Sequence, residues 1–334
     1  MAQSGNSGKG VLVTGATGFV GRNLVDALSR QGERVTCLVR ASSDTRLLEQ
    51  AGVRLVRGDV NDAAAIRQAV SGVRTVYHLA GVIKAARRDQ YFRVNREGTR
   101  LLLEILAEEN PGISRFVHMS SLAAAGPSGP AEGLGEDDTP RPVSWYGESK
   151  LESEREAVQF AKTFPVTVLR PSAVYGPHDR ETLLAFRMIR RGCLVTPGRS
   201  VRRFSLVHVH DLAAACLLAA ARDTPSGSVY FIARPEICTW EELGGAIARE
   251  LGRRCRQIRL PGWTAGAVGL AGDLWASATG RAATLNSQKV RELMQPNWIC
   301  NPSRALSELG FRPAIDLQRG IRETVRWYRE QGWL

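Results

Sequence analysis

The segment from residue 11 to 21, Val-Leu-Val-Thr-Gly-Ala-Thr-Gly-Phe-Val-Gly, constrains the fold of this chain more than any other. Its three leading apolar residues read as a short buried strand, and the amphipathic run from Phe19 to Leu28 predicts a helix directly after it. At such a junction Gly15 permits a tight turn, Gly18 lets a pyrophosphate approach the backbone, and Gly21 allows close packing of helix on strand. The segment therefore predicts a dinucleotide-binding turn with the helix N-terminus facing the phosphates. An ordinary glycine-rich turn is the alternative.

Strand and helix patterns alternate through the first half of the chain. After the first strand, apolar segments read as strands at 34–40, 53–60, 75–81, 115–121 and 166–171, with helix patterns between them. This alternation predicts an α/β fold with a doubly wound parallel sheet and a ligand at the carboxyl edge of its strands. We expect the dinucleotide-binding domain to comprise residues 10–175, with 205–233 returning to it. Residues 176–204 and 234–334 are then expected to form a smaller α/β substrate-binding domain.

Composition narrows the class of protein further. The 334 residues are 43% hydrophobic, which is enough for a buried core. Residues 1–9 are polar and glycine-rich, and they read as a disordered tail rather than a signal peptide. The six cysteines are scattered and form no CxxC pair, so we expect neither disulfides nor a metal site, and a cytoplasmic protein.

The chain is strongly basic, with a formal net charge of +12 and a pI near 10.0. Its arginines are spread along the sequence without a nucleic-acid-binding motif, so we expect no nucleic acid partner. Most of the charge reads as solvated surface, and a basic field favours an anionic ligand or loose contact with an anionic membrane face. The apolar window 260–280 is poor in Leu and Ile and interrupted by Asp273. We therefore expect it to form helices lining a substrate pocket rather than a stable membrane insertion.

The end of the second predicted strand bears on the choice of cofactor. NAD sites usually place a carboxylate there to accept the ribose hydroxyls, whereas this chain has Val39 and Arg40, followed by Ser42 and Ser43. A guanidinium can bind a 2′-phosphate in a bidentate manner, which favours NADP. An arginine that only stacks on the adenine would accept NAD as well.

The strongest chemical signal is Tyr146-x-x-x-Lys150, which follows a strand ending in Ser120 and Ser121. A spacing of four places both side chains on one face of a helix. A tyrosine that works near neutral pH needs its pKa lowered by about three units, or about 4 kcal/mol, and a neighbouring ammonium favours the phenolate. Asn95, on the helix pattern of residues 91–109, faces the sheet and reads equally well as a structural hydrogen-bonding residue.

Together these motifs resemble the extended short-chain dehydrogenase/reductase family, also called the NAD-dependent epimerase/dehydratase family, which binds its cofactor on a Rossmann sheet. The family often forms homodimers through helices that correspond to those around Leu101 and Leu151 here, so the resemblance implies a homodimer. It extends from Val11 to Leu334 and rests on Thr14-Gly-x-x-Gly18-x-x-Gly21, Gly58-Asp59-Val60, His78-Leu79-Ala80, Asn95, Ser120-Ser121, Tyr146-x-x-x-Lys150, Leu169-Arg170-Pro171, Val174-Tyr175-Gly176-Pro177 and His208-Val209-His210-Asp211-Leu212.

The resemblance implies a role for each matching residue. Tyr146 is implied to be the proton donor or acceptor, with Lys150 as its partner, and Ser121 to hydrogen-bond the substrate oxygen. Asp59 is implied to contact the adenine, and the segment from Pro171 to Val174 to border the nicotinamide. The full set of residues implied to contact the cofactor is Gly15, Thr17, Gly18, Phe19, Val20, Arg40, Asp59, Val60, Leu79, Ala80, Asn95, Tyr146, Lys150, Pro171 and Val174.

The substrate is defined less sharply. The run at 38–44 and the apolar segment 261–278 look more like dihydroflavonol 4-reductases and 3β-hydroxysteroid dehydrogenases, which act on a carbonyl or alcohol of an apolar skeleton. We therefore predict an NADP(H)-dependent oxidoreductase for a small steroid-, flavonoid- or lipid-like molecule. One alternative is a nucleotide-sugar epimerase or dehydratase with tightly bound NAD. Arg202 and Arg203 support this alternative, but Phe204 stands at the position where an arginine is expected, which argues against it. The other alternative is a non-catalytic protein that senses NADP.

Overall fold

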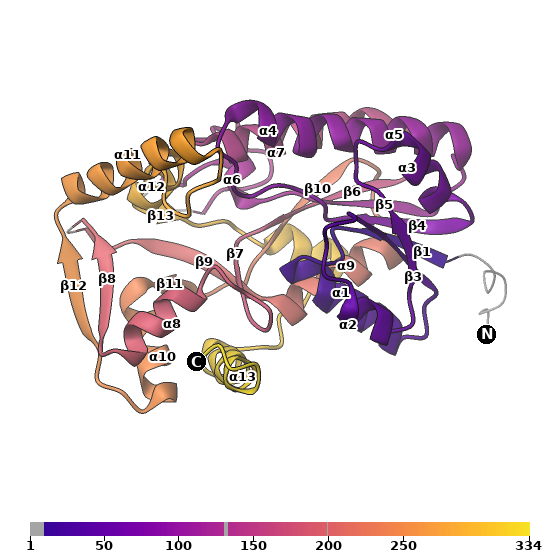
Figure 1. Ribbon diagram of the computed structural model, residues 1–334. Helices are drawn as coiled ribbons and strands as arrows, with labels where there is room; N and C mark the ends of the chain where they lie inside the picture. Colours follow the sequence, from indigo (N-terminus) through magenta and orange to yellow (C-terminus); the bar gives the residue numbers. More distant parts are fainter. Residues whose placement is uncertain (1–9, 130–132, 199) are drawn as a thin grey trace.

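A computed structural model describes residues 10–129, 133–198 and 200–334, so the predicted tail at residues 1–9 lies outside the described residues. Within that part of the chain, seven parallel strands form one sheet in the order β10-β6-β5-β4-β1-β2-β3 (Figure 1). This arrangement confirms the predicted doubly wound α/β fold, whose strand order reverses between β1 and β4. The strands are β1 (Gly10–Thr14), β2 (Val35–Val39), β3 (Arg54–Arg57), β4 (Val73–His78), β5 (Arg115–Met119), β6 (Val166–Pro171) and β10 (Ser228–Ile232).

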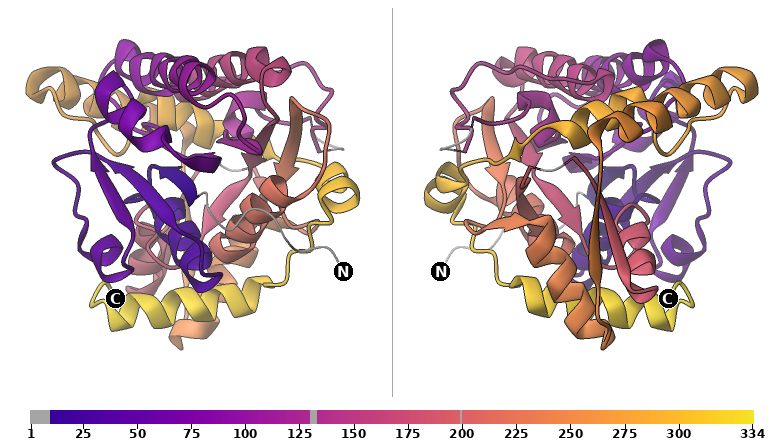
Figure 2. Two further views of the ribbon diagram at one scale, coloured as in Figure 1. Left: turned by 90° about the vertical axis from the view of Figure 1, so that its right-hand side faces the viewer. Right: turned by 90° about the vertical axis from the view of Figure 1, so that its left-hand side faces the viewer.

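Helices cover both faces of this sheet, as the side views in Figure 2 also show. One face carries α3 (Ala63–Val70), α5 (Gly98–Glu109) and α7 (Trp145–Gln159). The other carries α1 (Phe19–Arg30) and α9 (Val209–Ala221). Shorter helices lie in the connections: α2 (Arg46–Gln50), α4 (Arg88–Phe92), the π-helical turn η1 (Arg93–Glu97), α6 (Leu122–Ala125) and the 3₁₀ turn η2 (Phe160–Lys162).

Most of the remaining elements form the part of the molecule beyond the sheet's carboxyl edge, whereas η3 packs on α9 and β10 of the main sheet. β9 pairs with β7, β11 and β13, while β12 and β8 form a separate parallel pair. The strands are β7 (Ala173–Tyr175), β8 (Cys193–Pro197), β9 (Arg203–His208), β11 (Ile237–Thr239), β12 (Arg256–Leu260) and β13 (Asn297–Trp298). The helices are α8 (Leu183–Arg190), α10 (Trp240–Leu251), α11 (Gly262–Thr279), α12 (Ser287–Met294), the π-helical turn η3 (Ala305–Leu309) and α13 (Leu317–Glu330).

Two buried apolar clusters stabilise the main sheet, one on each face. Leu24 of α1 and Leu212 of α9 belong to the first, and Ile66 of α3 and Leu102 of α5 belong to the second. The strands between them are buried on both sides, which is why they read as continuous apolar runs instead of alternating ones.

Two segments differ from what the sequence predicts. The segment 172–177, which is not among the predicted strands, contains strand β7, because pairing with β9 supplies backbone hydrogen bonds that the local sequence does not signal. The window 260–280, predicted as helices lining a pocket, forms one long helix, α11, with an exposed outer face. No helix in the described ranges is long and apolar enough to cross a membrane.

Burial of the histidines predicts that the folded state loses stability in acid. Burial lowers the pKa of all five, His78 and His208 to about 3 and His118 well below 6.5, with smaller shifts at His178 and His210. The unfolded chain takes up these protons near pH 6.5 and the native state does not, so stability present above that pH is lost as the pH falls. Below pH 6.5, each fully buried imidazole lowers the free energy of unfolding by about 1.4 kcal/mol for every unit by which the pH falls.

We therefore expect urea unfolding to show a marked loss of stability between pH 7.5 and 5.5. Burial raises the pKa of Asp179 to about 6, so protonation of this carboxylate stabilises the native state as the pH falls. This gain offsets the loss of stability from about one buried histidine. His118→Gln, which can keep a hydrogen bond to Ser153, should reduce the loss. Equal stability at both pH values would contradict the prediction.

Candidate active site

The glycine turn between β1 and α1 has the shape that a dinucleotide requires. Gly15 has φ +72°, and a Cβ there would lie 2.7 Å from the backbone nitrogen of Ala80 at the end of the neighbouring strand. A Cβ at Gly21 would lie 2.2 Å from the carbonyl oxygen of Gly15. Gly18 is the N-cap of α1 and supplies no side-chain hydrogen bond, so the first amide groups of the helix are left for a ligand. The turn therefore fits a bound pyrophosphate.

The other predicted cofactor residues lie around the same carboxyl edge, where β2, β3, β4 and β6 end. Arg40 is exposed directly after β2, and Asp59 is exposed after β3 with its carboxylate accepting from the amide of Asn61 at 2.7 Å. The remaining ones are partly exposed (Thr17, Phe19, Val20, Leu79, Ala80 and Val174) or buried (Val60 and Pro171). Contact of each with a cofactor stays a prediction.

A continuous chain of hydrogen bonds connects this edge to the helices above it. The amide of Ala80 donates to Thr14 Oγ1 at 3.2 Å, and Thr14 Oγ1 lies 2.7 Å from His78 Nδ1. His78 Nε2 lies 2.8 Å from Thr99 Oγ1, which donates to the carbonyl of Asn95 at 2.6 Å. Because Thr99 uses its single proton on Asn95, His78 donates from Nε2 and is neutral. This chain fixes the turn that follows β4.

Asn95 lies in the π-helical turn η1, a type of distortion that is frequent at functional sites. Its amide accepts from the backbone of Val82 at 2.7 Å, and donates to the carbonyl of Val82 at 3.1 Å and to Ser149 Oγ at 2.8 Å. A Cβ at Gly81 would lie 3.1 Å from Asn95 Oδ1 and 4.0 Å from Lys150 Nζ. Asn95 thus holds the loop after β4 against the helix that carries Lys150, as its structural interpretation predicts.

The structure brings together the three residues expected to perform chemistry. Ser121 is the N-cap of α6 and accepts from the amide of Ala123 at 3.1 Å. Tyr146 lies in the first turn of α7, where Ser121 is close enough to lower the pKa of its phenol. Lys150 lies one turn later on the same helix and is only 3% exposed. A hydroxyl, a phenol and an ammonium therefore meet beyond the end of β5.

Burial dominates the ionisation of both α7 groups. Desolvation raises the pKa of Tyr146 to about 12, although the hydrogen bond from Ser121 lowers it. Desolvation lowers the pKa of Lys150 to about 8, although the carboxylate of Glu154 raises it. At neutral pH the phenol is therefore protonated and most of the lysine is charged. The lowered tyrosine pKa that sequence reasoning requires therefore needs a positive charge added to the site, such as that of an oxidised nicotinamide.

Glu154 is a positioning residue that sequence reasoning missed. It lies one further turn along α7, is 3% exposed, and forms a bidentate ion pair with Arg170 of β6 at 2.9 and 2.7 Å. Ser120 donates a hydrogen bond to the same carboxylate. The spacing of four between Tyr146, Lys150 and Glu154 is the signal that could have indicated it.

Helix α12 lies against the N-terminus of α7, a contact that sequence reasoning also missed. Ser144, the N-cap of α7, donates to Glu292 at 2.5 Å, and the amide of Trp145 donates to Gln288 at 3.2 Å. Glu292 raises the pKa of Tyr146 through its charge. Tyr91, whose ring centroid is 6.5 Å from that of Tyr146, hydrogen-bonds Asn286 at the start of α12. No local pattern in the sequence signals these contacts.

The arginines considered for phosphate binding differ in environment. Arg202 is 6% exposed, packs against the thioether of Met294 at 3.6 Å, and has its pKa lowered by burial. Arg203 is exposed on β9, and Phe204 is buried beside Trp240. Only Arg202 therefore faces the region of α12.

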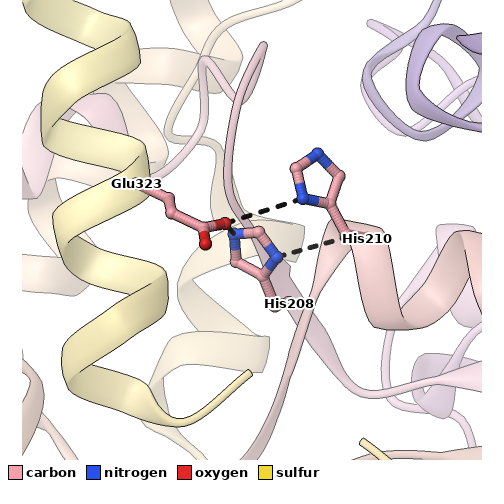
Figure 3. Close-up of side chains that lie close together, drawn as sticks. All are labelled: His208, His210 and Glu323. Atoms are coloured by element: carbon pink, nitrogen blue, oxygen red, sulfur yellow. Dashed lines mark hydrogen bonds and ion pairs between the residues drawn. The ribbon is translucent and has the colours of Figure 1, made fainter. Parts of the chain in front are cut away.

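His208, His210 and Glu323 form the one group in the described ranges whose donor atoms could hold a metal ion (Figure 3). Glu323 Oε2 lies 4.0 Å from His208 Nε2 and 3.6 Å from His210 Nδ1. His208 Nδ1 accepts from the amide of His210 at 3.4 Å, so the neutral ring carries its proton on Nε2. With that proton, Nε2 has no lone pair to offer a metal ion. The group therefore reads as a structural contact between β9 and α13. The neighbouring Asp211 likewise accepts from two amides before α13, those of Ala314 and Ile315.

A doubly wound sheet with a glycine turn after β1 and a Ser–Tyr–Lys set at its carboxyl edge defines a dinucleotide-dependent enzyme. The model of the NAD dependent epimerase/dehydratase family matches residues 11–233, and the chain belongs to that family. The predicted family is thereby confirmed.

Curated relatives are similar along almost the entire chain. Ceramide reductase from Caulobacter vibrioides is 35% identical over 325 residues, covering 97% of this chain and 96% of the relative. A 3 beta-hydroxysteroid dehydrogenase/Delta 5-->4-isomerase from Mycobacterium tuberculosis is 30% identical over 342 residues, covering 95% and 90%. The predicted likeness to the hydroxysteroid dehydrogenase branch is therefore confirmed.

Solved structures include relatives with a different substrate. MoeE5 in complex with UDP-glucose and NAD has a TM-score of 0.76 and 27% identity, covering 96% of this chain and 99% of its own. A structural neighbour thus binds NAD together with a sugar nucleotide on the same fold.

Proposed function

We propose that this protein is an NADP(H)-dependent oxidoreductase that interconverts a ketone and a secondary alcohol on an apolar, lipid-like substrate. The closeness of Ser121 to Tyr146, next to the buried Lys150, carries the proposal. The residues act on a single oxygen, because the hydroxyl and the phenol converge where β5 ends and Lys150 lies one helical turn away.

The chain's own residues account for the proton on that oxygen. Reduced nicotinamide, when bound, supplies a hydride for the carbonyl carbon. Ser121 orients the carbonyl oxygen, and Tyr146 donates its phenolic proton to that oxygen as the alcohol forms. Lys150, held charged by Glu154, stabilises the phenolate that Tyr146 becomes. Alcohol oxidation runs these steps in reverse.

Two observations support an apolar substrate. Helix α12 contacts the start of α7 next to Tyr146, and α11, which packs on α12, contains a single ionisable residue, Asp273. The relatives named a ceramide reductase and a 3 beta-hydroxysteroid dehydrogenase carry apolar substrates in their printed names. The proposal therefore places a lipid-like ketone beneath α12.

The cofactor and the setting follow from other residues. Arg40, exposed after β2 where NAD sites usually have a carboxylate, supports NADP over NAD. All six cysteines are free thiols, which supports a reducing, cytoplasmic setting. A homodimer through α5 and α7, which lie side by side on one face of the sheet, remains part of the proposal.

A nucleotide-sugar epimerase or dehydratase is the second candidate, favoured by the buried cation of Arg202 next to α12. In that case the cofactor is reduced and reoxidised within one turnover. The two candidates differ in whether NADPH is consumed.

The test is a spectrophotometric assay of the purified protein with NADPH or NADH and three substrates: a long-chain keto-lipid, a 3-oxosteroid and UDP-glucose. We expect stoichiometric loss of NADPH with an apolar ketone. We also expect a preference for NADPH over NADH that Arg40→Ala reduces by about tenfold, which corresponds to one charge-assisted contact of about 1.4 kcal/mol. Conversion of UDP-glucose without net cofactor loss would replace this proposal with the second candidate.

A further inference from the structure

Helix α11 packs with its small residues and exposes its large ones, the reverse of the usual arrangement. Gly269 and Ala276 are its buried residues, and a Cβ at Gly272 would lie 1.9 Å from the carbonyl oxygen of Leu285. The opposite surface exposes Trp263 (75%), Leu270 (60%), Leu274 (64%), Trp275 (47%) and Val268 (48%). Glycine and alanine thus form the contact with α12, while tryptophan and leucine are left outside.

The exposed surface of α11 has no charge. Its single ionisable residue, Asp273, turns inward and accepts from the amide of Ser287 at 3.3 Å. The apolar surface continues onto the end of β12, where Ile258 and Leu260 are also exposed. Helices that are apolar over their whole surface are normally covered by protein or lipid. We call this set of seven residues, from Ile258 to Trp275, the α11 surface.

The chain around the α11 surface is strongly basic. From Arg253 to Arg291 it has seven basic residues (Arg253, Arg254, Arg256, Arg259, Arg281, Lys289 and Arg291) and one acidic residue, Asp273. This segment alone carries a net charge of +6, half of that of the whole protein. Arg259 pairs with Glu241 and Lys289 with Glu292, whereas Arg281, two residues after the end of α11, is exposed and forms no ion pair in the ranges that the structure describes.

The α11 surface lies at the edge of the molecule and on the substrate side of it. Figure 2 shows α11 projecting outward beyond the other helices. Its inner face packs on α12, and α12 contacts Ser144 and Tyr91 beside the catalytic Tyr146. The outer surface is therefore one helix layer away from the position where the proposed substrate binds.

We propose that the α11 surface is a peripheral membrane-binding site that inserts shallowly into an anionic lipid bilayer. Two tryptophans and two leucines on one helix, surrounded by arginines, match the interface between lipid headgroups and acyl chains. The helix lies in the plane of the membrane and does not cross it, consistent with the absence of a membrane-crossing helix among the described residues. A second copy is a poorer occupant, because stacking two such surfaces would bring two +6 segments together.

This inference is independent of the proposed reaction. If the substrate is a membrane lipid, the α11 surface positions the active site next to its source, but membrane binding can be measured without any substrate.

The test is flotation of the full-length protein with two kinds of vesicle. One contains phosphatidylcholine alone, and the other also contains 30 mol% phosphatidylglycerol, so that about one lipid in three is anionic. We expect binding to the anionic vesicles, with the apparent Kd weakened at least tenfold by Leu270→Gln/Leu274→Gln and by raising the salt concentration. The matched control is Leu47→Gln/Leu184→Gln, which changes two equally exposed leucines on α2 and α8 and should leave binding unchanged. Circular dichroism verifies the folding of each variant.

The proposal would be overturned if the parent protein did not bind anionic vesicles, or if both double variants bound them equally well. It would also be overturned if Leu270→Gln/Leu274→Gln converted a dimer to a monomer without any loss of vesicle binding. Tryptophan fluorescence gives a second readout, since a blue shift on vesicle addition should diminish in Trp263→Gln. An undiminished shift in that variant would also count against the proposal.

Discussion

Replacing Tyr146 with phenylalanine is expected to lower the turnover number by a factor on the order of 10³, because this substitution removes the group that exchanges a proton with the substrate oxygen. The ring remains, so its packing near Tyr91 at 6.5 Å is retained. The substitution also removes the polar contact of the hydroxyl with Ser121, a loss of about 1 kcal/mol of stability at most. The measurement is the rate of NADPH oxidation at saturating ketone, with cofactor affinity determined separately by fluorescence titration.

A second tyrosine provides the control for this substitution. Tyr230 lies on β10 and donates to Glu308 at 2.7 Å, so Tyr230→Phe also removes one hydroxyl hydrogen bond, but in a structural position. We expect it to keep turnover within twofold of the parent. If Tyr146→Phe retained more than a tenth of the parent rate while binding cofactor normally, proton transfer would have to be assigned to another group.

Replacing Glu154 with glutamine is expected to have the largest effect on stability and a second effect on the pH profile. Arg170 is 4% exposed, and the substitution leaves its charge buried without a counter-ion. Breaking a buried ion pair in this way typically costs about 3 to 5 kcal/mol. We expect this loss in urea unfolding at pH 7.5.

The same substitution should change the ionisation of Lys150. Glu154 raises the pKa of that ammonium against desolvation, which brings it to about 8. Without the carboxylate the pKa falls further, so the charged fraction of Lys150 begins to decline at a lower pH. The alkaline limb of the pH–rate profile should therefore move to lower pH, an effect that a purely structural role for Glu154 would not produce.

Glu152→Gln is the matched control on the same helix. Glu152 pairs with Arg155 at 2.7 Å on the surface, and exposed pairs contribute about 0–1 kcal/mol. It should change neither the stability nor the pH profile appreciably. An unchanged alkaline limb in Glu154→Gln would show that Glu154 does not act on Lys150.

Prediction from the sequence was most accurate where the determining interactions are local. The strand–turn–helix at residues 11–21 was correct, because apolar runs and glycine positions define it within one segment. The convergence of Tyr146 and Lys150 on one helix face follows from the geometry of α7 alone. The seven-stranded sheet followed from the alternation of elements, since parallel strands require helical crossovers.

The predictions failed where partners are distant in the sequence. The segment after β6 forms strand β7 only because β9 pairs with it, with Tyr175 opposite His208. Ser144 meets Glu292 across 148 residues, and the chemical environment of Tyr146 depends on that contact. The pKa of Tyr146 likewise depends on tertiary packing, because desolvation is set by everything packed around a side chain and not by its own neighbours in the chain.

The sequence by itself determined the fold class, the glycine turn for a dinucleotide and the Ser–Tyr–Lys set, because each is encoded by spacings within one element or one junction. Only the tertiary structure decided that Glu154 and Arg170 pair behind Lys150, that α12 lies on the N-terminus of α7, and that α11 exposes its tryptophans and leucines. Local periodicity specifies which residues share a face of a helix. What that face meets depends on elements far away in the chain, and for α11 nothing in the described part of the protein covers it.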